Sequence, residues 1–381
     1  MDAAEIDDFL AATLRGSSDR WPDGWAPADV SDLAYGRIAY HGIAGLLWDD
    51  KASLESWPDE LKTRIRQQAV GQAMWEMRHR EALLELTEAA AARELDALLL
   101  KGTAIAYQLY SNPSARTRGD SDLLVRHSDL HRARALLSEL GYDRPFIFAS
   151  AERLMLQEMW TKDTAGAAHV IDLHWSPLNS MALRQVLTFD DCWADRVSLP
   201  RLCEAAVAPD PPTMLLHSCL HRAMHVASPY DVDGVTYYGG DRLIWLQDIH
   251  LLANALTDEQ WRRFCVKACS SGAAPICLVG LAMAQDRLGT PVPSEVRAAL
   301  TEPGRTASRY LESGQFRRAI MDVRSLAGFR YKLAYARERL LPHGKFLRAK
   351  YPDLEHRHTG FLVLRRALDF FRDRSRQGDR G

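Results

Sequence analysis

The chain has 381 residues, is 47% hydrophobic and 26% charged, and carries a formal net charge of -2. This composition lies in the ordinary globular range, and the length allows two or three domains. The first residues are acidic where a secretory signal is basic, and no apolar run approaches the roughly 20 residues that cross a bilayer, so we expect a cytoplasmic protein without a membrane span.

Residues 1–92 are predicted to form an N-terminal helical domain. Apolar residues recur there at three- and four-residue spacing, the pattern of an amphipathic helix. Pro22, Pro27 and Pro58 punctuate the pattern into three helical segments, of which the second covers residues 29–50.

Residues 93–209 are predicted to form a mixed sheet with helices packed on it. The expected elements are, in order, a strand at 95–102, a helix from Thr103, a strand at 121–125, a helix closed by Gly141, a long hairpin around 164–166, and two short strands within 195–209. An alternation of strands and helices followed by a hairpin indicates an α+β fold.

Residues 210–381 are predicted to form a C-terminal helical domain. Asp210 is a candidate N-cap for a helix with two prolines in its first turn. The expected helices cover 211–228, 240–256, 258–271, 274–288, 292–302, 306–326, 328–349 and 359–375.

Two segments of this C-terminal domain are open to two interpretations. Residues 231–241 hold three glycines and two tyrosines, so they form either a mobile loop that covers substrate or a plain connection. Residues 360–374 form an amphipathic basic helix, which either lies on a membrane surface or packs on the core with its arginines in solvent.

The chain contains the tripeptide Arg118-Gly119-Asp120, which in an extracellular protein can serve as an adhesive loop. Its six cysteines show no CxxC spacing, and several occupy apolar helical positions, which indicates buried, reduced thiols. With neither a disulfide framework nor a signal peptide, the adhesive interpretation is disfavoured.

Asp120, Asp122 and Asp172 are candidate metal ligands. Side chains alternate along a strand, so Asp120 and Asp122 point to the same side of residues 120–125. Two carboxylates this close repel each other unless a cation lies between them, which favours magnesium with its oxygen ligands. Asp172 lies within a second apolar strand, where a carboxylate without a partner is costly.

A candidate phosphate site precedes these acids. Gly102 and Thr103 lie between a strand and a helix, where backbone N–H groups and the helix dipole favour an anion. Lys101, Arg116 and Arg118 flank the acids and could neutralise phosphate oxygens. For Lys101, an ordinary solvated lysine at a strand end is the alternative.

Three histidines, His217, His221 and His225, recur every four residues and therefore line one helix face. One hypothesis is a zinc site that Asp248 or His250 in the next helix would complete. Hydrogen-bonded histidines on an internal face are the favoured alternative, because zinc motifs on a helix usually bring a nearby Glu.

A third interpretation joins part of this face to the following helix. His221, His225, Arg242 and Asp248 would form a polar cluster where the helical domain meets the sheet. Such a cluster could contact a substrate.

The stretch "LLKGTAIAYQLY", Pro113, Arg116, "GDSDLLV" and "HVIDLHW" resembles the nucleotidyltransferases of the DNA polymerase beta superfamily, and more closely a poorly characterised bacterial branch with an "LKG...D-x-D-LLV" pattern. The similarity covers residues 90–180 well and continues into the two histidine-bearing helical segments. It implies a polymerase-beta-like palm, a mixed sheet with flanking helices, between N- and C-terminal helical regions.

The resemblance also implies roles for the residues. Asp120 and Asp122 would bind two Mg²⁺ ions, or Mn²⁺, with Asp172 as the third carboxylate. Gly102 and Thr103 would contact a nucleoside triphosphate, ATP above all. The family's small glycine motif usually carries Ser where this chain has Thr103, and an apolar residue where it has Ser121.

The sequence thus predicts a magnesium-dependent nucleotidyltransferase that moves a nucleoside monophosphate from a triphosphate to a hydroxyl or phosphate group and releases pyrophosphate. The alternatives are phosphoryl transfer at the same site, or an inactive nucleotide-binding regulatory protein. A small-molecule or peptide acceptor fits better than nucleic acid, because no RNA-binding motif or strongly basic domain is evident.

Overall fold

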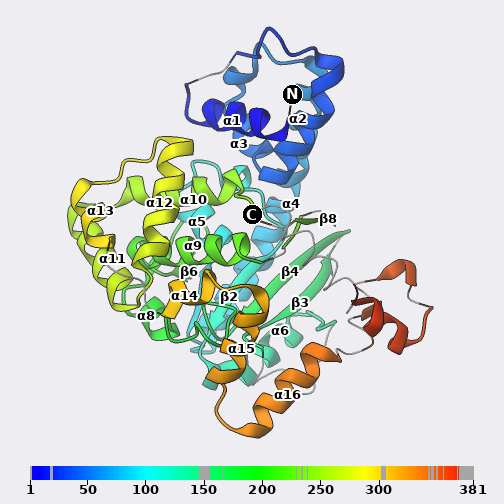
Figure 1. The fold of residues 1–381 in the computed structure, drawn as a ribbon, viewed down its shortest axis with the longest axis vertical. Coiled ribbons are helices and arrows are strands. Elements are labelled where there is room, and N and C mark those ends of the chain that lie inside the picture. Colours follow the sequence, from blue (N-terminus) through cyan, green and yellow to red (C-terminus); the bar gives the residue numbers. More distant parts are fainter. Residues whose placement is uncertain are drawn as a thin grey trace.

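The computed structural model describes residues 2–17, 20–145, 155–164, 166–228, 230–232, 235–237, 239–301 and 306–341, together with 344, 347–348, 351–354, 356–366 and 368. These residues form a mixed α+β structure in which a small mixed sheet is surrounded by many helices (Figure 1). Within this described part, no helix is both long and apolar enough to cross a bilayer.

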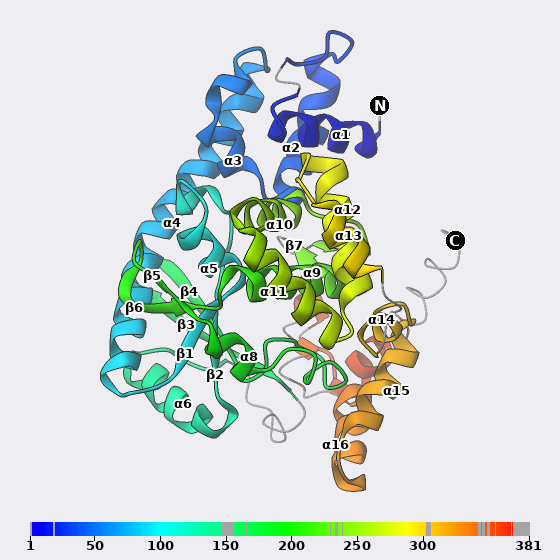
Figure 2. The same cartoon turned by 90° about the vertical axis from the view of Figure 1, so that its left-hand side faces the viewer.

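The N-terminal region is helical, as predicted. Its elements are α1 (Ala3–Leu14), α2 (Pro27–His41), α3 (Ala44–Asp49), the 3₁₀ turn η1 (Lys51–Leu54) and α4 (Asp59–Ala92). The single helix expected at 29–50 is instead two helices, because Gly42 ends α2 with a left-handed φ of 69°. Figure 2 shows α4 running from these helices down to the sheet.

The central sheet has the strand order β1-β2-β4-β3. Its strands are β1 (Ala97–Leu100), β2 (Ser121–Val125), β3 (Gln157–Thr164) and β4 (Ala167–His174). β2 is antiparallel to β1 and parallel to β4, whereas β3 and β4 form the predicted long hairpin. The predicted order of strands and helices is confirmed: α5 (Lys101–Gln108) follows β1, and the turns η2 (Pro113–Ala115) and η3 (His127–Asp129) and helix α6 (Leu130–Glu139) flank β2.

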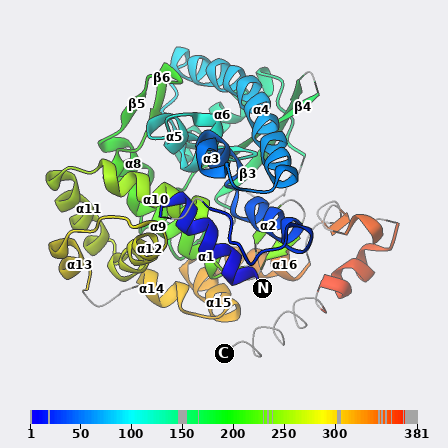
Figure 3. The same cartoon turned by 90° about the horizontal axis from the view of Figure 1, so that it is seen from above.

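The remaining described elements follow β4 in the sequence. They are α8 (Phe189–Ala194), β5 (Val197–Leu199), β6 (Cys203–Ala208), α9 (Pro211–Val226), β7 (Tyr230–Val232), β8 (Val235–Tyr237), α10 (Leu243–Ala255), α11 (Asp258–Ser270), α12 (Ala274–Leu288), α13 (Ser294–Leu300), α14 (Thr306–Leu311), α15 (Gln315–Ser325), α16 (Phe329–Leu340) and η4 (Pro352–Leu354). Seen from above, α4 lies over one part of the molecule and α9 to α13 lie together on another (Figure 3). The Asp210 carboxylate caps α9 as predicted, because it accepts from the Thr213 backbone N–H at 3.1 Å.

Three local predictions differ from the structure. Helix α8 was not expected, although Thr188 and Asp191 form a capping box at its start. The segment 231–241 is not a plain loop, since its start belongs to the hairpin of β7 and β8. The helix expected at 306–326 is divided before Gly314 into α14 and α15.

One connected core runs through these elements, from Ile6 in α1 to Tyr335 in α16. All six cysteines are free thiols, as predicted, and none forms a disulfide. The division into domains at residues 92 and 209 stays a prediction. The helix expected at 359–375 falls partly outside the described residues.

Candidate active site

Asp122 and Asp172 lie directly opposite each other on neighbouring strands. β2 and β4 are parallel, and their register pairs Asp122 with Asp172. His174 lies two residues beyond Asp172, so the two-residue period of the strand puts it on the same face. One ligand atom from each of these three residues lies within 4.8 Å of the other two.

The Asp122 carboxylate is buried and accepts two hydrogen bonds at the same oxygen. Lys101 Nζ donates to Asp122 Oδ1 at 2.5 Å, and His174 Nε2 lies 2.8 Å from that atom. Burial by itself would raise the pKa of Asp122, but the Lys101 ammonium and the His174 hydrogen bond outweigh it and hold the pKa well below its usual value. Asp122 is therefore a carboxylate with a fixed positive partner.

The pKa values of Asp172 and Asp120 are shifted in the opposite direction. Burial and the neighbouring carboxylates raise the pKa of Asp172 to about 7, although Gln157 Nε2 donates to Asp172 Oδ2 at 3.1 Å. Asp120 immediately precedes β2, and its side chain reaches solvent. Surrounding protein atoms and the Asp122 charge nevertheless raise the pKa of Asp120. The site thus holds more negative charge than Lys101 alone neutralises.

Lys101 is placed by an unusual backbone conformation. It is the first residue of α5 and has a left-handed φ of 50°, which is uncommon for a residue with a side chain. The side chain is mostly buried and points at Asp122. The structure therefore gives Lys101 a fixed position in the site rather than that of a solvated lysine at a strand end.

Gly102 makes room for an arginine. A Cβ on Gly102 would lie 2.9 Å from Cζ of Arg116. Arg116 is buried and forms a bidentate ion pair with Asp248 of α10, at 3.2 Å from Nε to Oδ1 and 2.7 Å from Nη2 to Oδ2. Tyr110 also donates to Asp248, at 2.8 Å. The structure thus brings Arg116 and Asp248 next to Gly102, the residue that follows Lys101.

Thr103 belongs to a buried polar chain on the other side of β2. The hydroxyls of Thr103 and Ser121 share a hydrogen bond of 2.7 Å, and His79 Nε2 of α4 lies 2.7 Å from the Ser121 hydroxyl. His79 continues the chain to His169 of β4, with 3.3 Å between the two Nδ1 atoms. This chain attaches the residue between Asp120 and Asp122 to helix α4.

Arg118 is buried in a second ion pair. It donates to Glu76 of α4, and Tyr107 donates to the other Glu76 oxygen at 2.5 Å. A buried Arg118 cannot present the Arg-Gly-Asp tripeptide to a receptor, so the adhesive interpretation is wrong. Both arginines predicted to contact phosphate are thus engaged with carboxylates in this structure.

Glu76→Ala is expected to lower the free energy of unfolding by about 3–5 kcal/mol, because it leaves the Arg118 guanidinium buried without a counter-charge. Urea unfolding measures the change. Glu259→Ala is the matched control, since the Glu259–Arg262 pair is exposed and should contribute nothing measurable. Equal losses in both variants would contradict the structural role of Glu76.

The histidine face of α9 borders the same site. His217 Nε2 lies 3.0 Å from the carbonyl oxygen of Pro177, and the Nε2 atoms of His221 and His225 are 2.9 Å apart. Burial and the nearby Lys101 ammonium lower the pKa of His217 to about 4. Burial likewise lowers the pKa of His225 to about 4, with Lys101 contributing. These histidines are therefore neutral at physiological pH.

His217 is expected to make the protein acid-sensitive. Its pKa is lower in the folded state, so its stabilisation is complete above pH 6.5 and is lost as the pH falls toward 4. Between pH 7.5 and pH 5 this one group should remove about 2 kcal/mol of unfolding free energy. Urea unfolding at both pH values measures the loss, and His217→Gln should reduce it by that amount. An unchanged pH dependence in the variant would contradict this assignment.

Trp245 and the β7–β8 hairpin lie beside His225. The rings of His225 and Trp245 are 5.2 Å apart, and Tyr230 of β7 stands at 5.8 Å from His225. Arg242 lies 5.6 Å from the Trp245 ring, and its Nε donates to the Tyr40 carbonyl oxygen at 2.5 Å. Asp248 is separate from this group, because it pairs with Arg116. The predicted four-residue polar cluster therefore divides into two neighbouring groups.

Metal-binding geometry favours the sheet over the histidine face. Among the residues that the structure describes, only Asp122, Asp172 and His174 bring three potential ligand atoms together. His250, one candidate for completing a zinc site, instead has its Nδ1 3.0 Å from the hydroxyl of Thr290.

Sequence reasoning missed four residues of this site: His174, Gln157, His79 and Glu76. His174 could have been found, because it lies two residues after Asp172 in the same strand and so shares its face. Gln157 requires the hairpin register, which pairs it with His174. The two α4 residues have no local signal, since their partners are more than 30 residues away in sequence.

The fold and the site together define an α+β protein with a buried acidic cluster on a mixed sheet, able to hold a divalent metal ion. The chain belongs to a family described as uncharacterised nucleotidyltransferases, whose model matches residues 28–289. This confirms the resemblance recognised in the sequence. No curated protein and no solved structure matches the chain. The matched range contains every residue of the site described above.

Proposed function

We propose that the protein transfers a nucleoside monophosphate from a nucleoside triphosphate, with ATP the first candidate, to a hydroxyl or phosphate group of a small-molecule or peptide acceptor. The observation that carries this proposal is the pairing of Asp122 with Asp172 across parallel strands, with His174 beside them. The order β1-β2-β4-β3 supports interpreting the sheet as a polymerase-beta-like palm. Membership of a nucleotidyltransferase family agrees with both.

The acidic cluster fits a hard divalent cation such as Mg²⁺ or Mn²⁺. Asp122 and Asp172 offer carboxylate oxygens at one place, whereas Asp120 is exposed, lies outside the group of three convergent ligands, and is proposed to add a carboxylate from the solvent side. Burial, and after it the charge of neighbouring carboxylates, raises the pKa values of Asp172 and Asp120, and a bound cation would offset both effects. When bound, Mg²⁺ would neutralise phosphate charge and favour ionisation of the attacking hydroxyl. His174 would orient Asp122 through the hydrogen bond that it already makes.

Lys101 and the first turn of α5 are proposed to bind the triphosphate. Lys101 carries the positive charge closest to the acids, and the backbone N–H groups around Gly102 and Thr103 lie at a helix N-terminus. Arg116 lies behind Gly102 and would add a positive potential while paired with Asp248. Arg118 is proposed to support the loop before β2 from its pair with Glu76.

The proposed reaction is an in-line displacement. An oxygen of the acceptor attacks the α-phosphorus and forms a new P–O bond, while the bond from that phosphorus to the α,β-bridging oxygen breaks and pyrophosphate leaves. Asp172 is proposed to accept the proton of the acceptor hydroxyl, because its carboxylate would lie beside the cation that the hydroxyl approaches. Lys101 balances negative charge on the phosphates throughout.

The α9 face is proposed to contact substrate. His221 and His225 are neutral and lie between Lys101 and the aromatic group of Trp245 and Tyr230. Neutral imidazoles and flat rings suit a nucleoside better than they suit phosphate. Arg242 borders this group, whereas Asp248 would act through Arg116.

In the test, the protein is incubated with Mg²⁺, radiolabelled ATP and a fractionated small-molecule extract, and the fate of the label is measured. Transfer of label from [α-³²P]ATP to a new species, with release of pyrophosphate, is the expected result. Transfer from [γ-³²P]ATP instead would indicate phosphoryl transfer. ATP binding without transfer of either label would indicate a regulatory protein, and absence of ATP binding would reject the proposal.

A further inference from the structure

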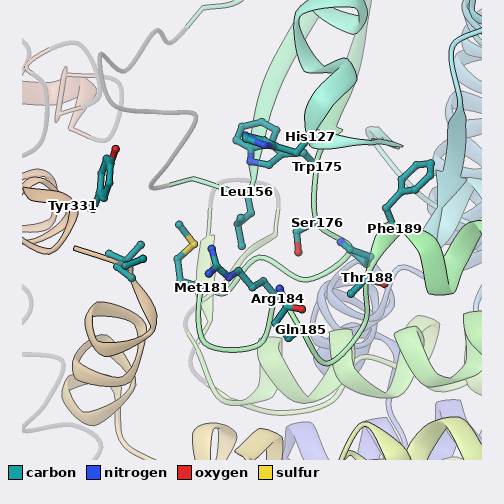
Figure 4. A pocket seen from close by; sticks show the side chains of 13 residues that line it. His127, Leu156, Trp175, Ser176, Met181, Arg184, Gln185, Thr188, Phe189 and Tyr331 are labelled. Carbon is teal, nitrogen blue, oxygen red and sulfur yellow. The ribbon is translucent and has the colours of Figure 1, made fainter. Parts of the chain in front are cut away.

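A separate cavity of about 420 Å³ opens at the ends of β2 and β4. It is shown in Figure 4 and is lined by His127, Leu156, Trp175, Ser176, Pro177 and Met181, followed by Arg184, Gln185, Thr188, Phe189, Leu326, Ala327 and Tyr331. None of the proposed metal or triphosphate residues lines it. Its volume suits a small molecule, because ligand pockets begin at roughly 300 Å³.

The cavity has one unpaired positive charge. Arg184 lies on the loop between β4 and α8, and no ion pair or hydrogen bond joins its side chain to any residue that the structure describes. None of the described residues that line the cavity is Asp or Glu. A partly buried guanidinium without a counter-charge favours an anionic group in the ligand.

The rest of the lining is apolar and aromatic. Trp175 and Phe189 are buried, with 7% and 8% of their surface exposed, and the Leu156 and Met181 side chains are also buried. Tyr331 of α16 stands across the cavity from the sheet (Figure 4). Aromatic walls and one guanidinium together suit an apolar or aromatic body that carries a single anionic group.

The cavity lies next to the acidic cluster along β4. Trp175 follows His174 directly and lies three residues after Asp172, a distance of about 10 Å along a strand. Pro177, which lines the cavity, receives the hydrogen bond of His217. The cavity therefore adjoins the strand end that carries Asp172 and His174.

We propose that this cavity binds the acceptor, a small apolar or aromatic molecule with one carboxylate or phosphate, whose hydroxyl reaches the acidic cluster. The assignment as acceptor rests on the proposed function, whereas binding in the cavity does not. The guanidinium of Arg184 matches a ligand that carries one anionic group. A triphosphate carries about four negative charges, and its proposed partners are Lys101 and a divalent ion at the acidic cluster. The hydroxyl oxygen forms the bond to the α-phosphorus as described above, and pyrophosphate leaves.

The test uses three probes in a calorimetric titration of the full chain: 3-phenylpropanoate, phenyl phosphate and the neutral 3-phenylpropan-1-ol. We expect at least one anion to bind about tenfold or more tightly than the alcohol. Arg184→Gln should abolish this preference. Arg324→Gln makes the same charge change at an exposed residue of α15 outside the lining and should retain the preference. The carboxylate and phosphate probes distinguish the two anion types.

Three outcomes would overturn the proposal: no binding of any probe, equal binding to the wild type and Arg184→Gln, or displacement of the anion by ATP with Mg²⁺. The last would assign the cavity to the donor. Ala327→Trp, which adds bulk at the rim, should weaken both anions without affecting ATP binding. Retained probe binding in Asp122→Asn with no nucleotidyl transfer in the wild type would reject the proposed function but not the cavity.

Discussion

Asp122→Asn is expected to lower metal-dependent turnover by at least about 10³-fold, because cation stabilisation of the transition state contributes several kcal/mol. The amide removes the charge that Lys101, His174 and the cation share. Its Oδ1 can still accept both existing hydrogen bonds, so the fold should persist. Nucleotidyl transfer with Mg²⁺, and Mn²⁺ binding followed by electron paramagnetic resonance, measure the two losses.

Asp163→Asn is the matched control for this change. Asp163 lies at the far end of β3 in the same sheet, is exposed, and pairs with Ala168 rather than with Asp172. It should keep both turnover and Mn²⁺ binding. Turnover in Asp122→Asn within a few-fold of the wild type would show that the carboxylate pair does not hold the catalytic cation.

Lys101→Met is expected to change metal affinity and turnover in opposite directions. Lys101 Nζ occupies Asp122 Oδ1 at 2.5 Å, so without the ammonium the acids should bind Mn²⁺ about tenfold more tightly. Turnover should fall about 10²-fold, since the fixed charge facing the triphosphate is lost. If Lys101 had only a structural role, replacing it would not raise the affinity for Mn²⁺.

Mn²⁺ titration and the initial rate at saturating ATP separate these two effects. Lys162→Met provides the control, because Lys162 lies on β3 and pairs with Glu85 on the surface. It should alter neither quantity. Weaker Mn²⁺ binding in Lys101→Met would contradict the competition between ammonium and cation.

Local patterns in the sequence predicted much of the sheet. The two-residue period placed Asp122 and Asp172 in strands, and the hairpin of β3 and β4 followed from two strand-like runs around a glycine. The same period could have added His174 to the site. The breaks between helices were harder to predict, because Gly42 and Gly314 lie in segments whose apolar pattern continues across them.

The sequence could not predict which charged residues form ion pairs with each other. Arg116 and Arg118 were expected at phosphate oxygens, and whether they reach them stays a prediction, but the structure pairs them with Asp248 and Glu76. Arg116 and Asp248 are 132 residues apart, and no local pattern links them. The cavity beside Trp175 had no signal either, since its wall combines strand ends, a loop and the start of α16.

The sequence by itself determined most of the strands and helices, and which acids share a face, because backbone geometry repeats every two or 3.6 residues. Only the tertiary structure decided which charges face each other, since that depends on how distant elements pack. It placed Lys101 on Asp122, enclosed both arginines and left Arg184 unpaired among the described residues. Burial increases the contribution of these pairings to stability, because a charge removed from water is costly without a partner.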